Sequence, residues 1–364
     1  MSSELYVGLM SGTSLDGVDA ALVDFAGAAP HILASTHRPF DAVLRAELLA
    51  LNAAASGELE RAALCANGLS RIYAAAVADV LAQASLPSSR LRAVGCHGQT
   101  VRHRPEAGYT IQLGNAALLA ELCGARVVAD FRGRDVAAGG QGAPLVPAFH
   151  AAVFRAGSEK RAVLNLGGIA NLTWLPSSGE VTGFDCGPGN CLMDRWAELH
   201  LGTPVDRDGA WGSGARADAQ LLDRLLQDPY FALPPPKSTG RDLFNETWLR
   251  ARLPGGCQPQ VVQATLLELT ARSSADALGR HCPGARRLIV CGGGVRNRAL
   301  MARLRELLAP MPVDSSAQHG IDPSLVEAAA FAWLARQTLA EAPASLPAVT
   351  GARGARVLGA VYPP

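Results

Sequence analysis

Apolar and polar positions alternate along this chain in patterns that predict strands and helices in turn. Two apolar runs, Tyr6–Met10 and Val18–Phe25, flank a polar turn that contains glycine, which is typical of a β-hairpin. Short apolar runs elsewhere predict buried strands, and apolar residues at helical spacing predict helices. The other predicted strands are Arg92–Cys96, Tyr109–Leu113, Ala125–Ala129, Arg161–Leu166, Leu172–Leu175, Val181–Phe184 and Arg287–Cys291. The predicted helices are Ala42–Leu51, Glu58–Ser85, Ala116–Leu122, Cys191–His200, Val261–Arg280, Arg298–Leu308 and 324–340.

A glycine-rich segment, Ala137–Pro147, interrupts this periodicity and is the predicted domain junction. It separates an N-terminal lobe at 1–136 from a C-terminal lobe at 137–342, and a return of the last segment, about 343–364, to the first lobe stays open. Each half has a strand, a glycine turn and a second strand, followed by alternating strands and helices. This arrangement predicts a duplicated α/β architecture with a ligand cleft between the lobes.

Composition narrows the class of protein. The chain has 364 residues, of which 49% are hydrophobic and 18% charged, enough for two folded domains. Lys+Arg 33 against Asp+Glu 32 leaves a net charge of +1, which argues against nonspecific nucleic-acid binding. Apolar stretches such as Ala116–Leu122 and Ala328–Ala335 are shorter than the roughly 20 residues that cross a bilayer, so no membrane span is expected. No basic patch followed by an apolar segment opens the chain, so no secretory signal is expected either.

Eight cysteines lie singly along the chain, without a CxxC motif or the Cys/His spacing of a zinc finger. Several of them, such as Cys96, Cys123 and Cys291, sit in or beside apolar runs, where a reduced cysteine packs as a small hydrophobic residue. We therefore expect reduced thiols, a cytoplasmic location and no structural zinc. The unusual count is glycine, at 38 residues.

Three glycine-rich turns each follow a predicted strand: Ser11–Gly17, Gly167–Asn171 and Gly292–Asn297. Glycine at a strand end lets backbone N–H groups approach phosphate oxygens, because no Cβ stands in the way. Any one such turn is better explained as a tight hairpin turn. Three of them, distributed over both halves, favour nucleotide phosphates as the ligand.

The first of these turns also carries polar side chains. Ser11, Thr13 and Ser14 add hydroxyl donors, and the carboxylates of Asp16 and Asp19 could hold a hydrated magnesium ion. The chain has no G-x-x-x-x-G-K-[ST] motif, so it is not a P-loop protein. The Gly292–Gly294 turn lacks the G-x-G-x-x-G spacing and lies near the C-terminus, which makes a dinucleotide-binding dehydrogenase a poor second interpretation.

Asp185 is the candidate catalytic residue. It follows the predicted strand Val181–Phe184 and precedes a turn that leads into a helix. A carboxylate at that edge of an α/β sheet faces the ligand crevice, where it could accept a proton from a hydroxyl or a water. The alternative is that Asp185 caps the following helix. Asn190 lies closer to the helix start and suits that position better, so we favour catalysis.

Two further polar clusters follow strands and could bind a polyhydroxylated or carboxylated substrate. The first contains His97 and Gln99, with Arg102, His103 and Arg104 beyond them, and the second contains Arg132, Arg134 and Asp135. A solvated loop of mixed charge explains each cluster equally well. Glu327 has a structural explanation as the capping-box partner of Ser324. The histidines show no metal-ligand spacing.

Eight longer motifs occur in order along nearly the whole chain. They are Gly8–Asp19, His97–Thr100, Ala129–Arg132, Gly139–Pro147, Asn165–Asn171, Phe184–Asn190, Pro236–Arg241 and Gly292–Asn297. Together they resemble the motifs of the 1,6-anhydro-N-acetylmuramic acid kinases. One departure is Cys186, where a small hydroxyl residue such as threonine is expected.

The resemblance implies an α/β fold of two RNase H-like lobes, of the actin and sugar-kinase type, with an ATP cleft between them. It implies a cell-wall recycling enzyme that converts 1,6-anhydro-N-acetylmuramate, ATP and water into N-acetylmuramate 6-phosphate and ADP. The partners it implies are a small anhydrosugar and a second copy of the chain, and neither nucleic acid nor membrane.

The resemblance also assigns site residues. Asp185 matches the catalytic aspartate of the family, and one loop matches its phosphate loop. The residues of that loop are Gly12, Thr13, Ser14, Leu15, Asp16, Gly17, Val18 and Asp19. The glycines that complete the nucleotide site are Gly167, Gly168, Gly292, Gly293 and Gly294. Candidate sugar contacts are Gln99, Arg132, Asp135 and Glu327, and Asp16 is the candidate for holding Mg²⁺ through a water.

The substrate's C6 oxygen lies in an ether bridge to C1 and carries no proton, so we expect Asp185 to deprotonate a water that attacks C1. Two alternatives stay open. A kinase for another anhydrosugar would carry the same nucleotide motifs. An actin-like or chaperone-like ATPase would couple nucleotide state to a partner, and it would turn over slowly without any sugar.

Overall fold

The computed structural model describes residues 3–12 and 14–364, and the chain divides into two compact units. Unit 1 comprises Met1–Val153 and Leu325–Pro364, and unit 2 comprises Phe154–Ser324. These limits differ from the predicted lobes, because 137–153 and 325–342 belong to unit 1. The reason lies at Asp135, whose carboxylate accepts hydrogen bonds from the Gly142 N–H at 2.8 Å and the Thr350 hydroxyl at 2.9 Å. These bonds tie the glycine-rich segment and the C-terminal region to unit 1.

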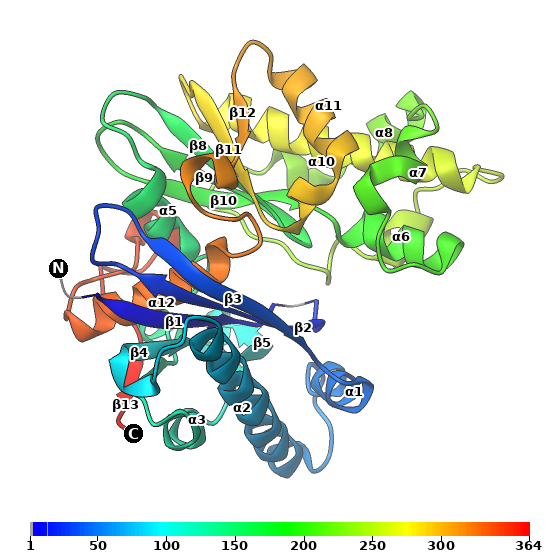
Figure 1. Cartoon of the computed structure of the whole chain (residues 1–364). Helices are drawn as coiled ribbons and strands as arrows, with labels where there is room; N and C mark the ends of the chain where they lie inside the picture. Colours follow the sequence, from blue (N-terminus) through cyan, green and yellow to red (C-terminus); the bar gives the residue numbers. More distant parts are fainter. Residues whose placement is uncertain (1–2, 13) are drawn as a thin grey trace. The chain divides into compact units, whose positions relative to one another are not determined.

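Unit 1 contains a six-stranded sheet in the order β13-β7-β4-β1-β2-β3 (Figure 1). Its strands are β1 (Leu5–Met10), β2 (Gly17–Asp24), β3 (His31–Pro39), β4 (Leu91–Cys96), β7 (Val127–Ala129) and β13 (Ala360–Tyr362). Strands β1, β2 and β3 are antiparallel neighbours, β4 and β7 continue parallel to β1, and β13 pairs antiparallel with β7. A separate hairpin is formed by β5 (Gln99–Arg104) and β6 (Tyr109–Leu113).

Unit 2 contains a five-stranded sheet in the order β10-β9-β8-β11-β12. Its strands are β8 (Arg161–Leu166), β9 (Ile169–Leu175), β10 (Thr182–Pro188), β11 (Arg287–Cys291) and β12 (Val313–Ser315). Again three antiparallel strands are followed by two parallel ones. Apart from the additional edge strand β13 of unit 1, the same order and directions therefore occur in both units, which confirms the predicted pair of RNase H-like lobes.

The helices fill the connections between these strands. In unit 1 they are α1 (Ala42–Ala50), α2 (Glu58–Gln83), α3 (Ala116–Cys123), α4 (Gly133–Ala137), α5 (Val146–Phe154), α12 (Val326–Leu339) and α13 (Pro347–Thr350), with 3-10 turns η1 (Ser88–Arg90) and η2 (Pro105–Ala107). In unit 2 they are α6 (Cys191–Leu201), α7 (Ala210–Ser213), α8 (Ala219–Leu226), α9 (Glu246–Arg250), α10 (Pro259–His281) and α11 (Arg298–Leu308), with 3-10 turns η3 (Arg207–Gly209), η4 (Pro229–Ala232), η5 (Gly293–Arg296) and η6 (Ser316–His319).

Helix α12 packs directly on β1 and β4. Gly8 in β1 permits this approach, because a Cβ there would overlap the backbone carbonyl of Ala328. The predicted capping box at the start of α12 is wrong. Ser324 donates through both its N–H and its hydroxyl to the Asp322 carboxylate, and the residue before the helix is Leu325. The predicted capping box between Ser324 and Glu327 is therefore not formed.

Among the described residues, α2 is the helix whose length and composition would suit a membrane span, a feature that the shorter apolar stretches did not suggest. Its buried residues include Leu69, Tyr73 and Val80, which belong to the hydrophobic core of unit 1. The helix packs against β2, β3 and α3. The apolar face of α2 is thus explained by the core that it covers.

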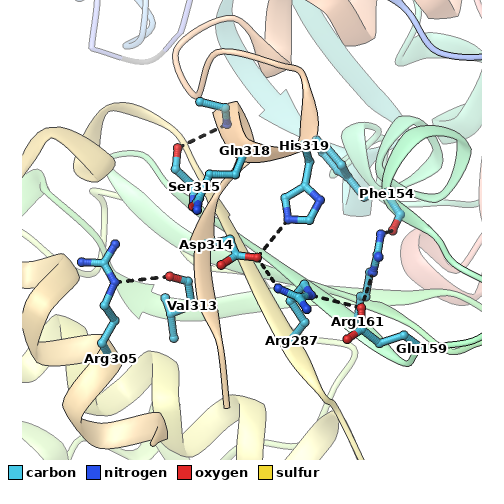
Figure 2. A network of polar contacts seen from close by, with 11 residues as sticks. Phe154, Glu159, Arg161, Arg287, Arg305, Val313, Asp314, Ser315, Gln318 and His319 are labelled. Carbon is cyan, nitrogen blue, oxygen red and sulfur yellow. Dashed lines mark hydrogen bonds and ion pairs between the residues drawn. The ribbon is translucent and has the colours of Figure 1, made fainter. Parts of the chain in front are cut away.

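Charged residues join the amino ends of the parallel strands of unit 2 (Figure 2). Arg161 and Arg287, the first residues of β8 and β11, both donate to the Glu159 carboxylate, at 2.8 and 3.1 Å. Arg287 also bonds Asp314 in β12, which accepts a further contact from His319 at 3.1 Å. Although burial opposes ionisation of Asp314, Arg287 and His319 lower its pKa. This network joins β8, β11 and β12 at their amino ends, opposite to the glycine turns that follow β8 and β11.

Candidate functional site

Asp185 lies inside β10, not beyond its end as the sequence pattern predicted. The pairing of β10 with β9 shifts between Asp185, opposite Asn171, and Gly187, opposite Ala170. Cys186 is the extra residue of this bulge. Bulges redirect side chains near functional sites, and a one-residue irregularity of this kind leaves no periodic signal in the sequence.

The backbone of segment 237–239 lies along Asp185 and fixes it. The Thr239 N–H donates to Asp185 Oδ2 at 2.9 Å, and the Asp185 N–H donates to the Lys237 carbonyl at 3.1 Å. The Tyr230 hydroxyl donates to the Asp185 carbonyl at 2.8 Å. Among the residues that the structure describes, none donates to Asp185 Oδ1. One carboxylate oxygen is therefore held in place while the other can accept a proton.

Burial raises the pKa of Asp185 to about 6, although the Thr239 N–H and the positive charge of Lys237 act in the opposite direction. The side chain is nevertheless half-buried and not fully enclosed. A carboxylate with a pKa close to the working pH is ionised at neutrality and still basic enough to take a proton in a reaction. Asp185 thus has the properties of a general base.

The turn between β8 and β9 is supported by the segment that follows β10. The carbonyls of Gly167 and Gly168 accept hydrogen bonds from the N–H groups of Asn190, Gly189 and Cys191, at 2.8, 2.9 and 3.1 Å. Asn190 occupies the N-cap position of α6, but its side chain donates to the Leu166 carbonyl at 3.0 Å. The prediction that Asn190 caps the helix through its side chain is therefore wrong. Its amide instead ties the helix start to the end of β8.

The third glycine turn lies beside the second. Gly292 has a φ of 85°, a region that favours glycine, and a Cβ there would overlap Asn165 Oδ1. A Cβ on Gly294 would lie 3.0 Å from Asn190 Oδ1, while Gly293 is exposed. The predicted glycines of unit 2 therefore surround the carboxyl ends of β8 and β11. This is the edge of the sheet at which α/β proteins bind ligands.

Three functional candidates in unit 2 were missed by reasoning from residue patterns, namely Tyr230, Lys237 and Arg241. Arg241 Nη2 lies 3.4 Å from the point where a Cβ on Gly168 would stand, so its guanidinium covers the β8–β9 turn. Lys237 and Arg241 belong to the motif Pro236–Arg241, which was noted only for its resemblance. This motif was the signal in the sequence that could have identified Lys237 and Arg241. The contact between Lys237 and Asp185 forms only in the folded chain, so residue patterns could not predict it.

The predicted phosphate loop of unit 1 connects β1 to β2. The Gly12 carbonyl accepts from the Leu15 N–H at 3.3 Å and from Gln99 Nε2 at 3.1 Å. Leu15 is buried with a φ of 56°, which is strained for a branched residue. Ser14 donates its hydroxyl to Asp16 at 2.7 Å on the exposed side of the loop. Thr13 lies outside the described residues.

The remaining predicted residues of this loop, Gly17, Val18 and Asp19, form the start of β2. Asp19 contacts His37 Nδ1 at 2.9 Å on the surface. No group of three or more His, Cys, Asp or Glu side chains suited to a metal occurs in the part of the chain that the structure describes. An exposed carboxylate such as Asp16 fits a magnesium ion that keeps most of its waters.

Behind the loop of unit 1, the structure brings together His97, Gln99, Arg132 and Glu327. Arg132 donates to His97 Nε2 at 3.0 and 2.9 Å and to the Gly142 carbonyl at 2.8 Å. His97 Nδ1 contacts the Ser11 carbonyl at 3.2 Å. Since Nε2 accepts from Arg132, the proton of the imidazole is on Nδ1. Burial and the neighbouring Arg132 lower the pKa of His97 to about 3, so it stays neutral.

Burial lowers the pKa of Arg132 to about 10, while Glu327 and Asp135 favour its charged form. Arg132 therefore remains a cation at neutral pH. Asp135 is fully buried, and both its oxygens accept hydrogen bonds within unit 1. Glu327 is half-buried at the start of α12. Arg102, by contrast, forms an ion pair with Glu58.

The chain is similar throughout to one group of proteins. It is 56% identical over 374 residues to the anhydro-N-acetylmuramic acid kinase of Variovorax paradoxus, with 100% of each chain covered. It is 57% identical over 364 residues to the enzyme of that name from Bordetella pertussis, covering 99% of this chain and 96% of the other. A structural likeness to the (R)-2-hydroxyglutaryl-CoA dehydratase component A of Acidaminococcus fermentans has 13% identity and a TM-score of 0.48, with 91% and 98% of the chains covered.

The family model of the anhydro-N-acetylmuramic acid kinases matches residues 4–364. This match includes all the turns, the bulged strand with Asp185 and the Arg132 cluster. The chain belongs to the anhydro-N-acetylmuramic acid kinase family.

Proposed function

We propose that the protein is an ATP-dependent kinase that hydrolytically opens the ring of 1,6-anhydro-N-acetylmuramic acid and phosphorylates O6. The products are N-acetylmuramate 6-phosphate and ADP, as expected of an enzyme of cell-wall recycling. The observation that carries the proposal is Asp185, which has one oxygen held by the Thr239 N–H and a pKa of about 6. The family name supports the choice of substrate.

The bonds of the substrate dictate what the base has to do. The C6 oxygen is bonded to C1 and offers no proton, so Asp185 takes a proton from a water. The water oxygen bonds to C1, the C1–O6 bond breaks, and O6 bonds to the γ-phosphorus of ATP. The bond from that phosphorus to the β-phosphate oxygen breaks, and ADP leaves. The proton on Asp185 is then returned to solvent.

The glycine turns supply backbone N–H groups for the phosphates of ATP, those of Gly12–Asp19 in unit 1 and those of Gly167, Gly168 and Gly292–Gly294 in unit 2. Arg241 adds a cation beside Gly168. Such fixed donors stabilise the charge of the transferred group. Magnesium, held through a water by Asp16, would neutralise part of the phosphate charge.

The sugar contacts are assigned to unit 1. Arg132 offers a cation for a carboxylate such as the lactyl group, and Gln99 and Glu327 offer polar groups for hydroxyls and the amide. Asp135 is a positioning residue, because both its oxygens are already bonded to Gly142 and Thr350. The eight free cysteines agree with a reducing cytoplasm. A homodimer is the expected assembly, which sedimentation of the purified protein would test.

The reaction in heavy-oxygen water tests the proposal. Mass spectrometry of the product should find the label in the C1 hydroxyl and none in the phosphate. Label in the phosphate, or no label in the sugar, would contradict attack of water at C1. ADP release should require the anhydrosugar, and equal release without sugar would favour a nucleotide-driven switch. Levoglucosan as a second substrate distinguishes an enzyme that reads the lactyl group from a general anhydrosugar kinase.

A further inference from the structure

Unit 2 contains a cavity of about 190 Å³ beside the strand that carries Asp185. Cys186 of β10 forms one wall, and the last turns of α10 form another. The polar and charged side chains that line it are Lys237, Ser273, Asp276, Arg280 and His281. The Asp185 carboxylate is not part of this lining, although the neighbouring Cys186 and Lys237 are.

Lys237 is the unusual residue of this cavity. Its ammonium lies 3.3 Å from the Tyr230 carbonyl and 4.7 Å from the centre of the Tyr230 ring. In the part of the chain that the structure describes, no carboxylate oxygen lies within 4.0 Å of it. The Asp185 carboxylate favours the charged form of Lys237 from beyond this distance. A half-buried ammonium without a direct ion pair is unfavourable, because burial removes water that would otherwise stabilise the charge.

Two more nitrogen groups face the same space. The Arg280 guanidinium donates to the Phe231 carbonyl at 3.3 Å and lies 3.7 Å from Asp276, an exposed residue. The His281 ring packs edge-on against Phe184, and no hydrogen bond to its nitrogens is formed by the described residues. Both groups therefore have donor capacity left for a ligand.

The three groups repel one another. Burial lowers the pKa of Lys237, and Arg280 lowers it further. Burial likewise lowers the pKa of His281, with Lys237 and Arg280 adding to the effect. Asp276 is the one carboxylate of the lining and is already paired with Arg280. Within the lining, the cationic side chains therefore outnumber the carboxylates, although Asp185, outside the lining, offsets part of the charge of Lys237.

We propose that the cavity lined by Lys237, Arg280 and His281 binds a small oxyanion, with inorganic phosphate as the best fit. Phosphate accepts hydrogen bonds on several sides, which matches an ammonium, a guanidinium and an imidazole placed around one space. A cavity of this size holds a few water molecules, each with a share of about 30 Å³, or one hydrated phosphate ion. The site goes beyond the proposed function, and its test requires no catalysis.

The chain offers a direct test, because Lys237 and Lys160 are its two lysines. Both lysines of the full chain are acetylated with an amine-reactive reagent, with and without inorganic phosphate, at an ionic strength matched with chloride. Mass spectrometry then measures the rate of acetylation at each lysine. We expect phosphate to slow acetylation of Lys237 at least about threefold and to leave the exposed Lys160 unchanged. Equal rates at Lys237 with and without phosphate would overturn the proposal.

An Arg280→Gln variant distinguishes this cavity from the glycine turns, which also attract phosphate. Protection of Lys237 should disappear in this variant, whereas protection that persists would place the ion elsewhere. Arg286→Gln, on the loop before β11, is the matched control. The melting temperature of each variant shows whether it remains folded.

Two further measurements sharpen the assignment. In wild-type protein, phosphate should raise the pKa of His281, read from the NMR shift of its ring protons, because an anion favours the imidazolium. An unchanged His281 titration would contradict binding beside it. Glucose 6-phosphate serves as the second arm, since a phosphate monoester shares the chemistry. Protection by this ester alone, and not by the free ion, would overturn the preference for a free ion.

Discussion

The two units share one strand order but differ in what stands beside their first hairpin. In unit 2 the β8–β9 turn is held by N–H groups of residues 189–191, and the adjoining strand β10 carries a carboxylate with a raised pKa. In unit 1 the β1–β2 turn is held by Gln99, and the groups behind it are a neutral histidine and a buried arginine. The same topology therefore supports a proton acceptor in one unit and a fixed cation in the other.

The difference arises from local polarity. Burial raises the pKa of Asp185 and lowers the pKa values of His97 and Arg132, because it disfavours whichever form is charged. Of these three groups, Asp185 is the one that titrates near neutrality, because burial moves an acidic group toward pH 7. A duplicated fold thus acquires distinct functions through a few buried side chains, and the following experiments test that division.

Asp185→Asn has the largest expected effect. We expect kcat to fall about 10³-fold or more, because the amide cannot accept the proton, while nucleotide binding stays near that of wild type. Turnover is measured by coupled ADP release, and binding by calorimetry. Asp223→Asn, an exposed position on α8, is the matched control and should retain activity. Near-normal turnover of Asp185→Asn would remove this residue as the base.

Acid should weaken unit 1 more than unit 2. The folded-state pKa values of His97 and His150 are lowered to about 3 by burial, so below pH 6.5 the unfolded chain binds protons that the folded unit does not. Stability should fall by roughly 2 kcal/mol for each histidine between pH 8 and pH 5.

In unit 2 two carboxyl groups have the opposite effect, because acid stabilises the folded state through them. Burial raises the pKa values of Asp185 and Asp194 to about 6 and about 7, so the folded unit takes up protons before the unfolded chain does. Hydrogen exchange is measured at pH 8 and at pH 5 and corrected for the intrinsic exchange rates. It reports the stability of each unit separately. Equal loss of protection in the two units would contradict the assigned pKa shifts.

Lys237→Met should move the acid limb of activity. The titratable groups that face Asp185 within unit 2 are Lys237, Tyr230 and Cys186, and Lys237 is the one cation among them. Asp185 has to be ionised to act, so activity should decline as the pH falls through about 6. Without the ammonium the carboxylate is less acidic, and the limb should shift upward by up to about one pH unit. Lys160→Met is the control, and an unshifted limb would show that Lys237 has no influence on the base.

Tyr230→Phe should have the smallest effect. It removes the hydroxyl that donates to the Asp185 carbonyl, a bond worth about 1 kcal/mol. We expect kcat to fall severalfold, with the pH of the acid limb unchanged. Tyr109→Phe in unit 1, at an exposed ring, should match the wild type. A loss as large as that of Asp185→Asn would indicate a direct role of the hydroxyl in the reaction.

Much of the local structure followed from the pattern of apolar residues. The ranges Tyr109–Leu113, Arg161–Leu166, Arg287–Cys291 and Arg298–Leu308 are observed as predicted. Of these, Arg161–Leu166, Arg287–Cys291 and Arg298–Leu308 each bury one face or more, which gives them a clear periodicity. Strand β3 was missed, because it lies at the edge of its sheet and has few buried positions. The polar strand β5 and the three-residue strands β12 and β13 were missed as well.

The candidate site also combines features that the sequence predicts with features that are decided only by folding. The sequence by itself determined the glycine turns, since a backbone that has to approach its neighbours closely excludes a Cβ, and it determined Asp185 as the candidate base. The tertiary structure decided that Asp185 lies on a bulge against segment 237–239, that Asn190 supports β8 and that Asp135 is a buried structural carboxylate. It also decided the pKa values of Asp185 and His97. Those depend on which groups surround a side chain after folding, and residues 54 positions apart, such as Asp185 and Thr239, become neighbours only when the chain is packed.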